Sequence, residues 1–176
     1  MHPYADTFIS EKDTSSVEPV YPLECFLDEE TGYIKLGCET NPEDRYNLYD
    51  YSYTSSNSSF SRNYWDEYAK HVSLKLNLKD ASIYEIGSND GYLSEQFKNL
   101  GHTILGIDPS HYMAKLAKER GVETFCEVFS EATSQKITDR YGKADVVVAN
   151  NVFNHSNDPL DFALGVKDVL SDSGVF

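Results

Sequence analysis

The fold is decided by one stretch of the sequence, Ser82-Ile83-Tyr84-Glu85-Ile86-Gly87-Ser88-Asn89-Asp90-Gly91-Tyr92-Leu93. Its apolar first half predicts a short strand, and its two glycines predict a sharp turn that leads into a helix. Leu93, Phe97 and Leu100 recur at helical spacing, so we expect them to share one face of that helix. Gly101 follows at once and predicts its end.

A second β-rich run, residues 103–107, follows that helix and stops at an acidic residue, Asp108. Asp108 lies 21 residues after Gly87, at the end of the second predicted strand. A carboxylate at that place can accept hydrogen bonds from ribose hydroxyls. Strand, glycine turn, helix, strand and acidic residue together predict a βαβ nucleotide-binding unit. The plainer alternative is a strand–turn–helix with a chance pair of glycines.

The glycine turn differs from the one that binds dinucleotides. Its glycines are spaced G-x-x-x-G, and Asn89 stands where a dinucleotide turn has another glycine. Asp90 is expected at the start of the helix, where its charge would repel a phosphate and favour a cationic ligand. S-adenosylmethionine carries a sulfonium and an ammonium group and no phosphate. The turn therefore predicts S-adenosylmethionine as cofactor in preference to NAD.

The rest of the chain continues the alternation of helices and strands, which predicts an α/β fold with a doubly wound parallel sheet. A helix over residues 63–77, with Trp65, Ala69, Val72 and Leu76 on one face, is expected to cover the sheet. The later predicted elements are a helix from Ser110 to Gly121, a strand over 122–125, a helix from Ser130 to about 142, a strand over 144–149, a helix from Asp158 with Pro159 at its first position, a turn over 171–174 and a fifth strand that begins at Val175. A doubly wound sheet would not normally stop there, so we expect the chain to be C-terminally incomplete.

Three regions are predicted along the chain: a loose leader (1–20), an N-terminal aromatic segment (21–62) and the cofactor-binding domain (63–176). The aromatic segment holds a predicted strand over 33–36 after a turn over 28–32, and then a run of tyrosines and serines. Tyrosine rings with their hydroxyl tips suit a sugar ligand. A surface loop with partly buried aromatic rings would have the same composition.

The composition excludes several classes of partner. The 176 residues carry a net charge of −14 with no basic stripe, which argues against nucleic acid and against anionic membranes as partners. No apolar run is long enough to span a bilayer, so we expect a cytoplasmic protein. The three cysteines, Cys25, Cys38 and Cys126, lack C-x-x-C spacing, which predicts reduced thiols and no metal site. The oligomeric state is left open.

Two further sites could carry chemistry. Asn150 and Asn151 follow the fourth predicted strand, at the edge where open α/β sheets bind ligands, and could hold the amino-acid part of a cofactor. Ordinary turn chemistry is the alternative. His155 comes four residues later and could be a general base or a substrate ligand, although a lone histidine in a turn is more often a surface residue.

Four segments together resemble class I S-adenosylmethionine-dependent methyltransferases, whose cofactor domain is a Rossmann-like doubly wound sheet. They are Glu85-Ile86-Gly87-Ser88-Asn89-Asp90-Gly91, Gly106-Ile107-Asp108-Pro109-Ser110, Ala149-Asn150-Asn151-Val152-Phe153-Asn154-His155, and residues 165–176. Within that superfamily the chain resembles C-methyltransferases that act on nucleotide-linked keto-deoxysugars. The G-S-N-D-G run and the upstream run Tyr51-Ser52-Tyr53-Thr54-Ser55-Ser56-Asn57-Ser58 carry this finer likeness.

The resemblance implies a role for each matching residue. The cofactor would be bound by Glu85, Gly87, Ser88, Asn89, Asp90, Gly91, Asp108, Pro109, Ser110, Val128, Phe129, Asn150 and Asn151. Asp108 would bind the ribose, Val128 and Phe129 would flank the adenine, and Asn150 would lie near the methionine part. His155 and Tyr53 would face the substrate as catalytic residues. The substrate would be a small molecule, a nucleotide-linked sugar.

The chain departs from that family in two places. The family has an N-terminal zinc module with a C-x-x-C-G pair, whereas this chain has Asp28 and Thr31 at those positions, so we expect no zinc. The family's tyrosine–glutamate–histidine constellation, which supplies the base for C-methylation, lies beyond the fifth strand. Two alternatives therefore stay open: an O- or N-methyltransferase acting on another small molecule, and a cofactor-binding chain without activity.

Overall fold

The structure is a computed structural model that describes residues 3, 9–15, 17–47 and 52–176. The chain separates into two compact units, Met1–Ser52 and Tyr53–Phe176. From the sequence we placed the domain boundary ten residues later, after residue 62. Residues 53–62 lie with the second unit because their serines bond to the glycine turn and cap the helix that follows.

The first unit contains little regular structure. A short 3-10 helix, η1 (Glu11–Asp13), falls within the predicted leader, of which residues 1–2, 4–8 and 16 lie outside the described residues. Strands β1 (Cys25–Leu27) and β2 (Ile34–Leu36) form an antiparallel hairpin, and α1 (Pro42–Asn47) follows. The predicted strand over 33–36 is thus confirmed as β2, while its partner β1 was not predicted. Tyr49 and Tyr51 of the tyrosine-rich run lie outside the described residues.

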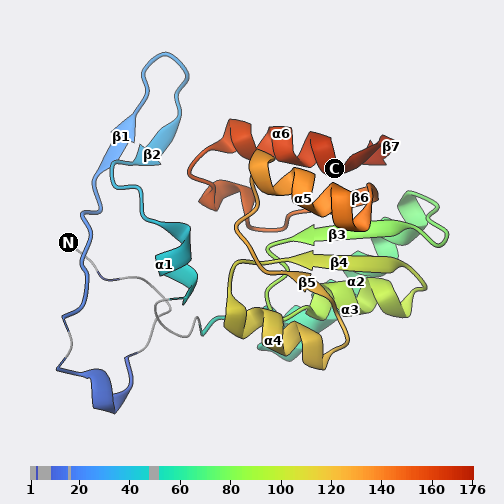
Figure 1. Ribbon diagram of the computed structural model, residues 1–176, viewed down its shortest axis with the longest axis horizontal. Helices are drawn as coiled ribbons and strands as arrows, with labels where there is room; N and C mark the ends of the chain where they lie inside the picture. Colours follow the sequence, from blue (N-terminus) through green and yellow to red (C-terminus); the bar gives the residue numbers. More distant parts are fainter. Residues whose placement is uncertain (1–2, 4–8, 16, 48–51) are drawn as a thin grey trace. The chain divides into compact units, whose positions relative to one another are not determined.

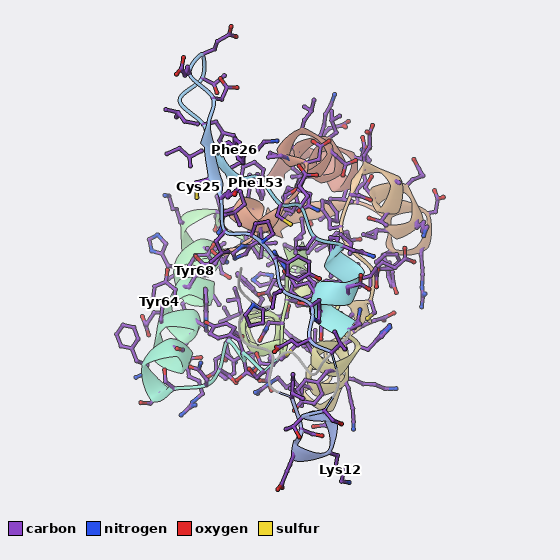
Figure 2. The ribbon with its side chains drawn as sticks, turned by 90° about the vertical axis from the view of Figure 1, so that its left-hand side faces the viewer. Lys12, Cys25, Phe26, Tyr64, Tyr68 and Phe153 are labelled. Carbon is purple, nitrogen blue, oxygen red and sulfur yellow. The ribbon has the colours of Figure 1, made fainter. Side chains whose placement is uncertain are left out.

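The hairpin is closed by a turn that its own side chains stabilise. The Asp28 carboxylate accepts the backbone N–H groups of Glu30 and Thr31 at 2.9 and 3.1 Å, and these hydrogen bonds lower the pKa of Asp28. The Phe26 ring packs over Gly37, where a Cβ would come within 2.0 Å of it. Figure 2 shows Cys25 and Phe26 on β1. All six strand residues are exposed.

The second unit is a parallel sheet in the order β5-β4-β3-β6-β7, with helices on both faces (Figure 1). Its strands are β3 (Ser82–Ile86), β4 (Thr103–Ile107), β5 (Thr124–Phe125), β6 (Ala144–Val148) and β7 (Leu170–Val175). Its helices are α2 (Ser59–Lys75), α3 (Tyr92–Asn99), α4 (His111–Glu119), α5 (Glu131–Tyr141), the 3-10 helix η2 (Phe153–His155) and α6 (Pro159–Val169). The predicted doubly wound α/β sheet is confirmed.

The sheet has a core on each face because side chains alternate along its strands. Tyr84 and Ile86 of β3 point to the face that α5 and α6 cover, and join one core cluster. Ile83, which precedes Tyr84 on β3, points to the other face and packs with α2 and α3 residues. Both faces of β3 are therefore buried, as expected for a central parallel strand.

Most predicted helix boundaries are confirmed by their caps. Ser110, Ser130 and Asp158 accept backbone N–H groups at the starts of α4, α5 and α6. Helix α2 begins four residues before the predicted start because Ser58 accepts the Ser61 N–H and caps it. Leu100, which we expected on the buried face of α3, instead follows the end of that helix and is 43% exposed.

The fifth strand is longer than predicted. Residues 171–174, predicted as a turn, belong to β7, which runs from Leu170 to Val175. Leu170 pairs with Ala144 and Val175 with Val146, so five steps along β7 match two steps along β6. The extra residues are accommodated by an irregular register, which explains why their sequence looks like that of a turn.

Candidate cofactor-binding site

The turn between β3 and α3 requires its two glycines. Gly87 and Gly91 have φ angles of +70° and +74°, a region that side chains disfavour. A Cβ on Gly87 would lie 2.3 Å from the Val152 side chain, and one on Gly91 would lie 2.8 Å from the Ala117 side chain. The turn therefore packs closely against the loop after β6, through Gly87, and against helix α4, through Gly91.

Asp108 lies at the end of β4, next to this turn. Its two carboxylate oxygens accept the backbone N–H groups of Asn89 and Ser110 at 2.8 and 2.9 Å. The side chain is only 7% exposed, and burial raises the pKa of Asp108 to about 6, against the effect of those two hydrogen bonds. Each oxygen keeps a lone pair that can accept a further hydrogen bond, for example from a hydroxyl group.

Glu85, near the end of β3, is also buried. Its carboxylate accepts a hydrogen bond from the Ser94 hydroxyl at 2.5 Å. Burial raises the pKa of Glu85 to about 8, and the charges of Asp90 and Asp108 add to this rise. Three carboxyl groups thus gather at one edge of the sheet, and because Glu85 is protonated at neutral pH, Asp108 is the one that would repel a phosphate.

Asp90 differs from its expected role. Its buried carboxylate accepts hydrogen bonds from the hydroxyls of Ser55, at 2.6 Å, and Ser56. It also forms an ion pair with Arg120, at 3.3 Å. The charge of Asp90 is therefore neutralised within the protein, and the argument that it faces a cationic ligand loses its basis. Sequence reasoning missed these partners because they lie 30 or more residues away along the chain.

Ser88, Pro109 and Ser110 present little side-chain surface to a ligand. Ser88 is 1% exposed, and its hydroxyl has no hydrogen-bond partner among the described residues. Ser110 is fully buried and caps α4. Pro109 lies between Asp108 and Ser110, and its carbonyl accepts the Cys126 thiol at 3.7 Å.

Val128 and Phe129, which follow β5 after two further residues, lie in different surroundings. Val128 is half-buried. Phe129 is 8% exposed and packs edge-to-face on Phe162, with ring centroids 5.2 Å apart, inside the core beneath α5 and α6. Of the two residues expected to flank the adenine, Val128 is therefore the more accessible.

The loop after β6 carries three of the predicted residues. The Asn150 amide nitrogen is buried and has no hydrogen-bond partner among the described residues. Asn151 is exposed and adopts a φ of +57°, which asparagine tolerates better than most residues. His155 is exposed at the end of η2, which is anchored by Phe153, a residue labelled in Figure 2, through an edge-to-face contact with Phe162 at 5.4 Å.

Tyr53 reaches the glycine turn through its backbone. Its carbonyl accepts a hydrogen bond from the Asn89 side chain at 3.0 Å, while its own side chain is 47% exposed. Hydrogen bonds thus connect Tyr53 through Asn89 to Asp108. The Asn150–His155 loop adjoins the turn where Val152 lies over Gly87.

The described residues show no cluster of metal ligands and no membrane-crossing helix. They contain no group of three or more histidine, cysteine, aspartate or glutamate side chains that could hold a metal ion, and the absence of zinc stays a prediction. In the same part of the chain, no helix is both long enough and apolar enough to cross a bilayer. Among the described residues, Cys25, Cys38 and Cys126 form no disulfide.

The strand order, the glycine turn and the acidic residue after the second strand of the sheet define the Rossmann-like fold of class I methyltransferases. Residues 84–176 match the family described as "Methyltransferase domain", and the chain belongs to this family. The predicted family is thus confirmed.

The chain is similar to two curated methyltransferases. It is 27% identical over 178 aligned positions to the C-methyltransferase NovU of Streptomyces niveus, covering 99% of this chain and 41% of NovU. It is 29% identical over 106 positions to a ubiquinone biosynthesis O-methyltransferase of Xanthomonas oryzae pv. oryzae, covering 59% of this chain and 44% of that protein. The chain thus spans less than half the length of these relatives.

A solved structure supports the fold. The plantazolicin methyltransferase BpumL, solved with a pentazolic desmethylPZN analogue and SAH (S-adenosylhomocysteine), superposes with a TM-score of 0.52 at 17% identity. The superposition covers 66% of this chain and 45% of BpumL.

Proposed function

We propose that residues 53–176 bind S-adenosylmethionine and support the transfer of its methyl group. The observation that carries this proposal is Asp108, a buried carboxylate that backbone N–H groups of Asn89 and Ser110 hold beside the glycine turn. A carboxylate at the end of the second strand of such a sheet binds ribose hydroxyls in nucleotide-binding folds. The S-adenosylhomocysteine in BpumL, a relative in fold, supports the same ligand.

The surrounding residues fit this cofactor. The unpartnered Asn150 amide can donate to a carboxylate, and Glu85 can accept from an ammonium group. The Asp108 carboxylate, which is ionised at neutral pH, favours a ligand without phosphate, and this separates S-adenosylmethionine from NAD. When bound, the cofactor supplies an electrophilic methyl group on a sulfonium. Asp108 would hold its ribose, Val128 would adjoin its adenine, and Glu85 and Asn150 would hold its amino-acid part.

For the methyl acceptor we propose a carbon atom of a nucleotide-linked keto-deoxysugar. Similarity to the C-methyltransferase NovU extends over 99% of the chain and so includes the tyrosine–serine segment before α2. Similarity to the O-methyltransferase covers only 59%. O-methylation of another small molecule is the second candidate, and this shorter match is what favours it.

In C-methylation a base must take a proton from the carbon beside the ketone, whereas O-methylation needs only a hydroxyl to lose its proton. We propose that His155 and Tyr53 face the acceptor and orient it, because both side chains are exposed near the carboxyl edge of the sheet. We place the reaction in the cytoplasm, where the thiols of the three cysteines would stay reduced.

Calorimetry with S-adenosylhomocysteine and with NAD tests the cofactor. We expect S-adenosylhomocysteine to bind more tightly, and Asp108→Asn to weaken its binding by roughly 1.5–3 kcal/mol, the scale of hydrogen bonds to a charged group. Asp145→Asn is the matched control, because Asp145 also accepts a backbone N–H, from Ser82 at 2.9 Å, but at the opposite end of β3. Tighter binding of NAD, or an equal loss of affinity in both variants, would contradict the proposal.

A further inference from the structure

Asn89 makes hydrogen bonds in two directions. Its backbone N–H donates to the Asp108 carboxylate at 2.8 Å. Its side chain accepts the Ser55 backbone N–H at 2.8 Å and donates to the Tyr53 carbonyl at 3.0 Å. One residue therefore joins the carboxylate proposed to bind ribose to the segment that carries Tyr53.

We call this segment, residues 53–58, the strap. Hydrogen bonds to several other elements hold it in place. The Ser55 and Ser56 hydroxyls bond to Asp90, and the Ser55 carbonyl accepts the indole N–H of Trp65 at 3.2 Å. Arg120 joins these groups, since its guanidinium donates to the Ser56 hydroxyl at 3.0 Å and to the Asp90 backbone carbonyl at 3.0 Å.

Arg120 is in turn held by the start of α3. It pairs with Glu95 at 3.2 Å and lies over the Tyr92 ring, 5.2 Å from its centroid. The Asp90–Arg120 contacts fix the strap to helices α3 and α4, but they do not reach Asp108. Among the contacts described, Asn89 alone bonds both to Asp108 and to the strap.

We propose that Asn89 is a positioning residue that couples cofactor binding at Asp108 to the position of the strap, and with it to Tyr53 on the acceptor side. This inference rests on the proposed function. A ligand that fixes Asp108 also fixes the Asn89 N–H, and the side chain of the same residue then holds the strap in one place. Coupling of this kind is reciprocal, so a correctly placed strap also strengthens cofactor binding.

Trp65 provides a specific signal, because it is the single tryptophan of the chain and its indole N–H bonds to the strap. The experiment measures the exchange of this proton with water by NMR, without ligand and with saturating S-adenosylhomocysteine. In the unmodified chain we expect the ligand to slow exchange about fivefold or more, the lower end of typical coupling between sites.

Asn89→Gly removes both side-chain bonds and keeps the backbone N–H, in a conformation that glycine adopts readily at φ +49°. We expect this variant to lose most of the ligand-dependent slowing. Asn77→Gly is the control, since Asn77 has a similar φ of +50° at the exposed end of α2. If Asn89→Gly does not fold, Asn89→Asp is used, which keeps the acceptor for Ser55 but lacks the donor to Tyr53.

The outcomes separate coupling from mere structural support. If the Asn89 bonds only support the structure, the variant should change the exchange rate of the Trp65 proton by the same factor with and without ligand. The ratio of the exchange rate without ligand to the rate with ligand would then be the same in the variant and in the unmodified chain, and this result overturns the proposal. The proposal is also overturned if the unmodified chain binds S-adenosylhomocysteine and the exchange of the Trp65 proton does not become slower. If the ligand does not bind at all, calorimetry shows it, and the proposed function fails together with the coupling.

Discussion

At the scale of single residues, Glu85 makes stability depend on pH. Burial raises its pKa from 4.5 to about 8, so the folded protein retains this proton at pH values where the unfolded chain has lost it. Stability contributed by the neutral form is complete below pH 4.5 and is lost as the pH rises towards 8. Asp108 acts in the same direction between pH 3.8 and about 6.

We therefore expect the ligand-free protein to lose on the order of 2 kcal/mol of unfolding free energy between pH 6 and pH 8.5 through Glu85. Glu85→Gln should remove that part of the loss, because the neutral amide can still accept the Ser94 hydroxyl. Urea unfolding at both pH values measures it, with Glu67→Gln, at an exposed position on α2, as the control. Equal pH dependence in the unmodified protein and Glu85→Gln would refute this account.

Individual site residues could be predicted from sequence only where the signal is local. Asp108 follows from its distance to the glycine turn, and its geometry agrees with that argument. The sequence assigns Asp90 to a cationic ligand because of its place at a helix start. In the structure its carboxylate instead accepts hydrogen bonds from Ser55 and Ser56 and pairs with Arg120. Contacts between residues so distant along the chain leave no periodic pattern in a single sequence, so neither Arg120 nor the role of Asn89 could be inferred.

At the scale of elements, the packing of α3 against α4 depends on Gly91. This glycine precedes α3 at φ +74°, and a Cβ there would lie 2.8 Å from the Ala117 side chain and 3.0 Å from its backbone. Gly101 also has a positive φ, +94°, after α3, but a Cβ there would meet nothing within 4 Å. The two positions therefore separate backbone strain from steric overlap.

We expect Gly101→Ala to destabilise the protein by about 1–2 kcal/mol, the cost of a left-handed backbone conformation for alanine. Gly91→Ala should cost a further 1–3 kcal/mol or so, because overlap with α4 forces the helices apart. Denaturant midpoints of the two variants measure the difference. Equal losses would mean that the close approach of α4 contributes nothing.

Elements were predictable where caps and periodicity coincide. Serine or aspartate caps marked the starts of α4, α5 and α6, and a nearly continuous apolar run marked the buried strand β6. Strand β7 was misassigned because pairing with β6, rather than its own serine–aspartate–glycine sequence, makes residues 171–174 part of a strand. Strand β1 was missed because its three residues, Cys-Phe-Leu, are all apolar and show no alternation with polar ones, whereas Ile-Lys-Leu in β2 does.

At the scale of the whole molecule, the two units differ in how they are stabilised. Both core clusters, from Ala69 to Val169, lie within Tyr53–Phe176, as do the strap and the caps of its helices. In the first unit, the hairpin exposes every strand residue, and a two-stranded hairpin is marginally stable at best in water. The cooperative unfolding of the chain should therefore come from the second unit.

This difference predicts that a chain of residues 53–176 folds by itself. Its urea midpoint should agree with that of residues 1–176 within roughly 0.3 M, and its m-value should fall only slightly, since m follows the surface exposed on unfolding and the hairpin buries little. Circular dichroism and Trp65 fluorescence should report one coincident transition. A chain of residues 59–176, which lacks the strap and keeps all of α2, is the matched comparison. It should unfold at lower urea, because Asp90 and Arg120 lose their contacts with Ser55 and Ser56.

If residues 53–176 unfold without cooperativity, the first unit contributes to the core after all. If both shortened chains are equally stable, the strap is not part of the folded unit.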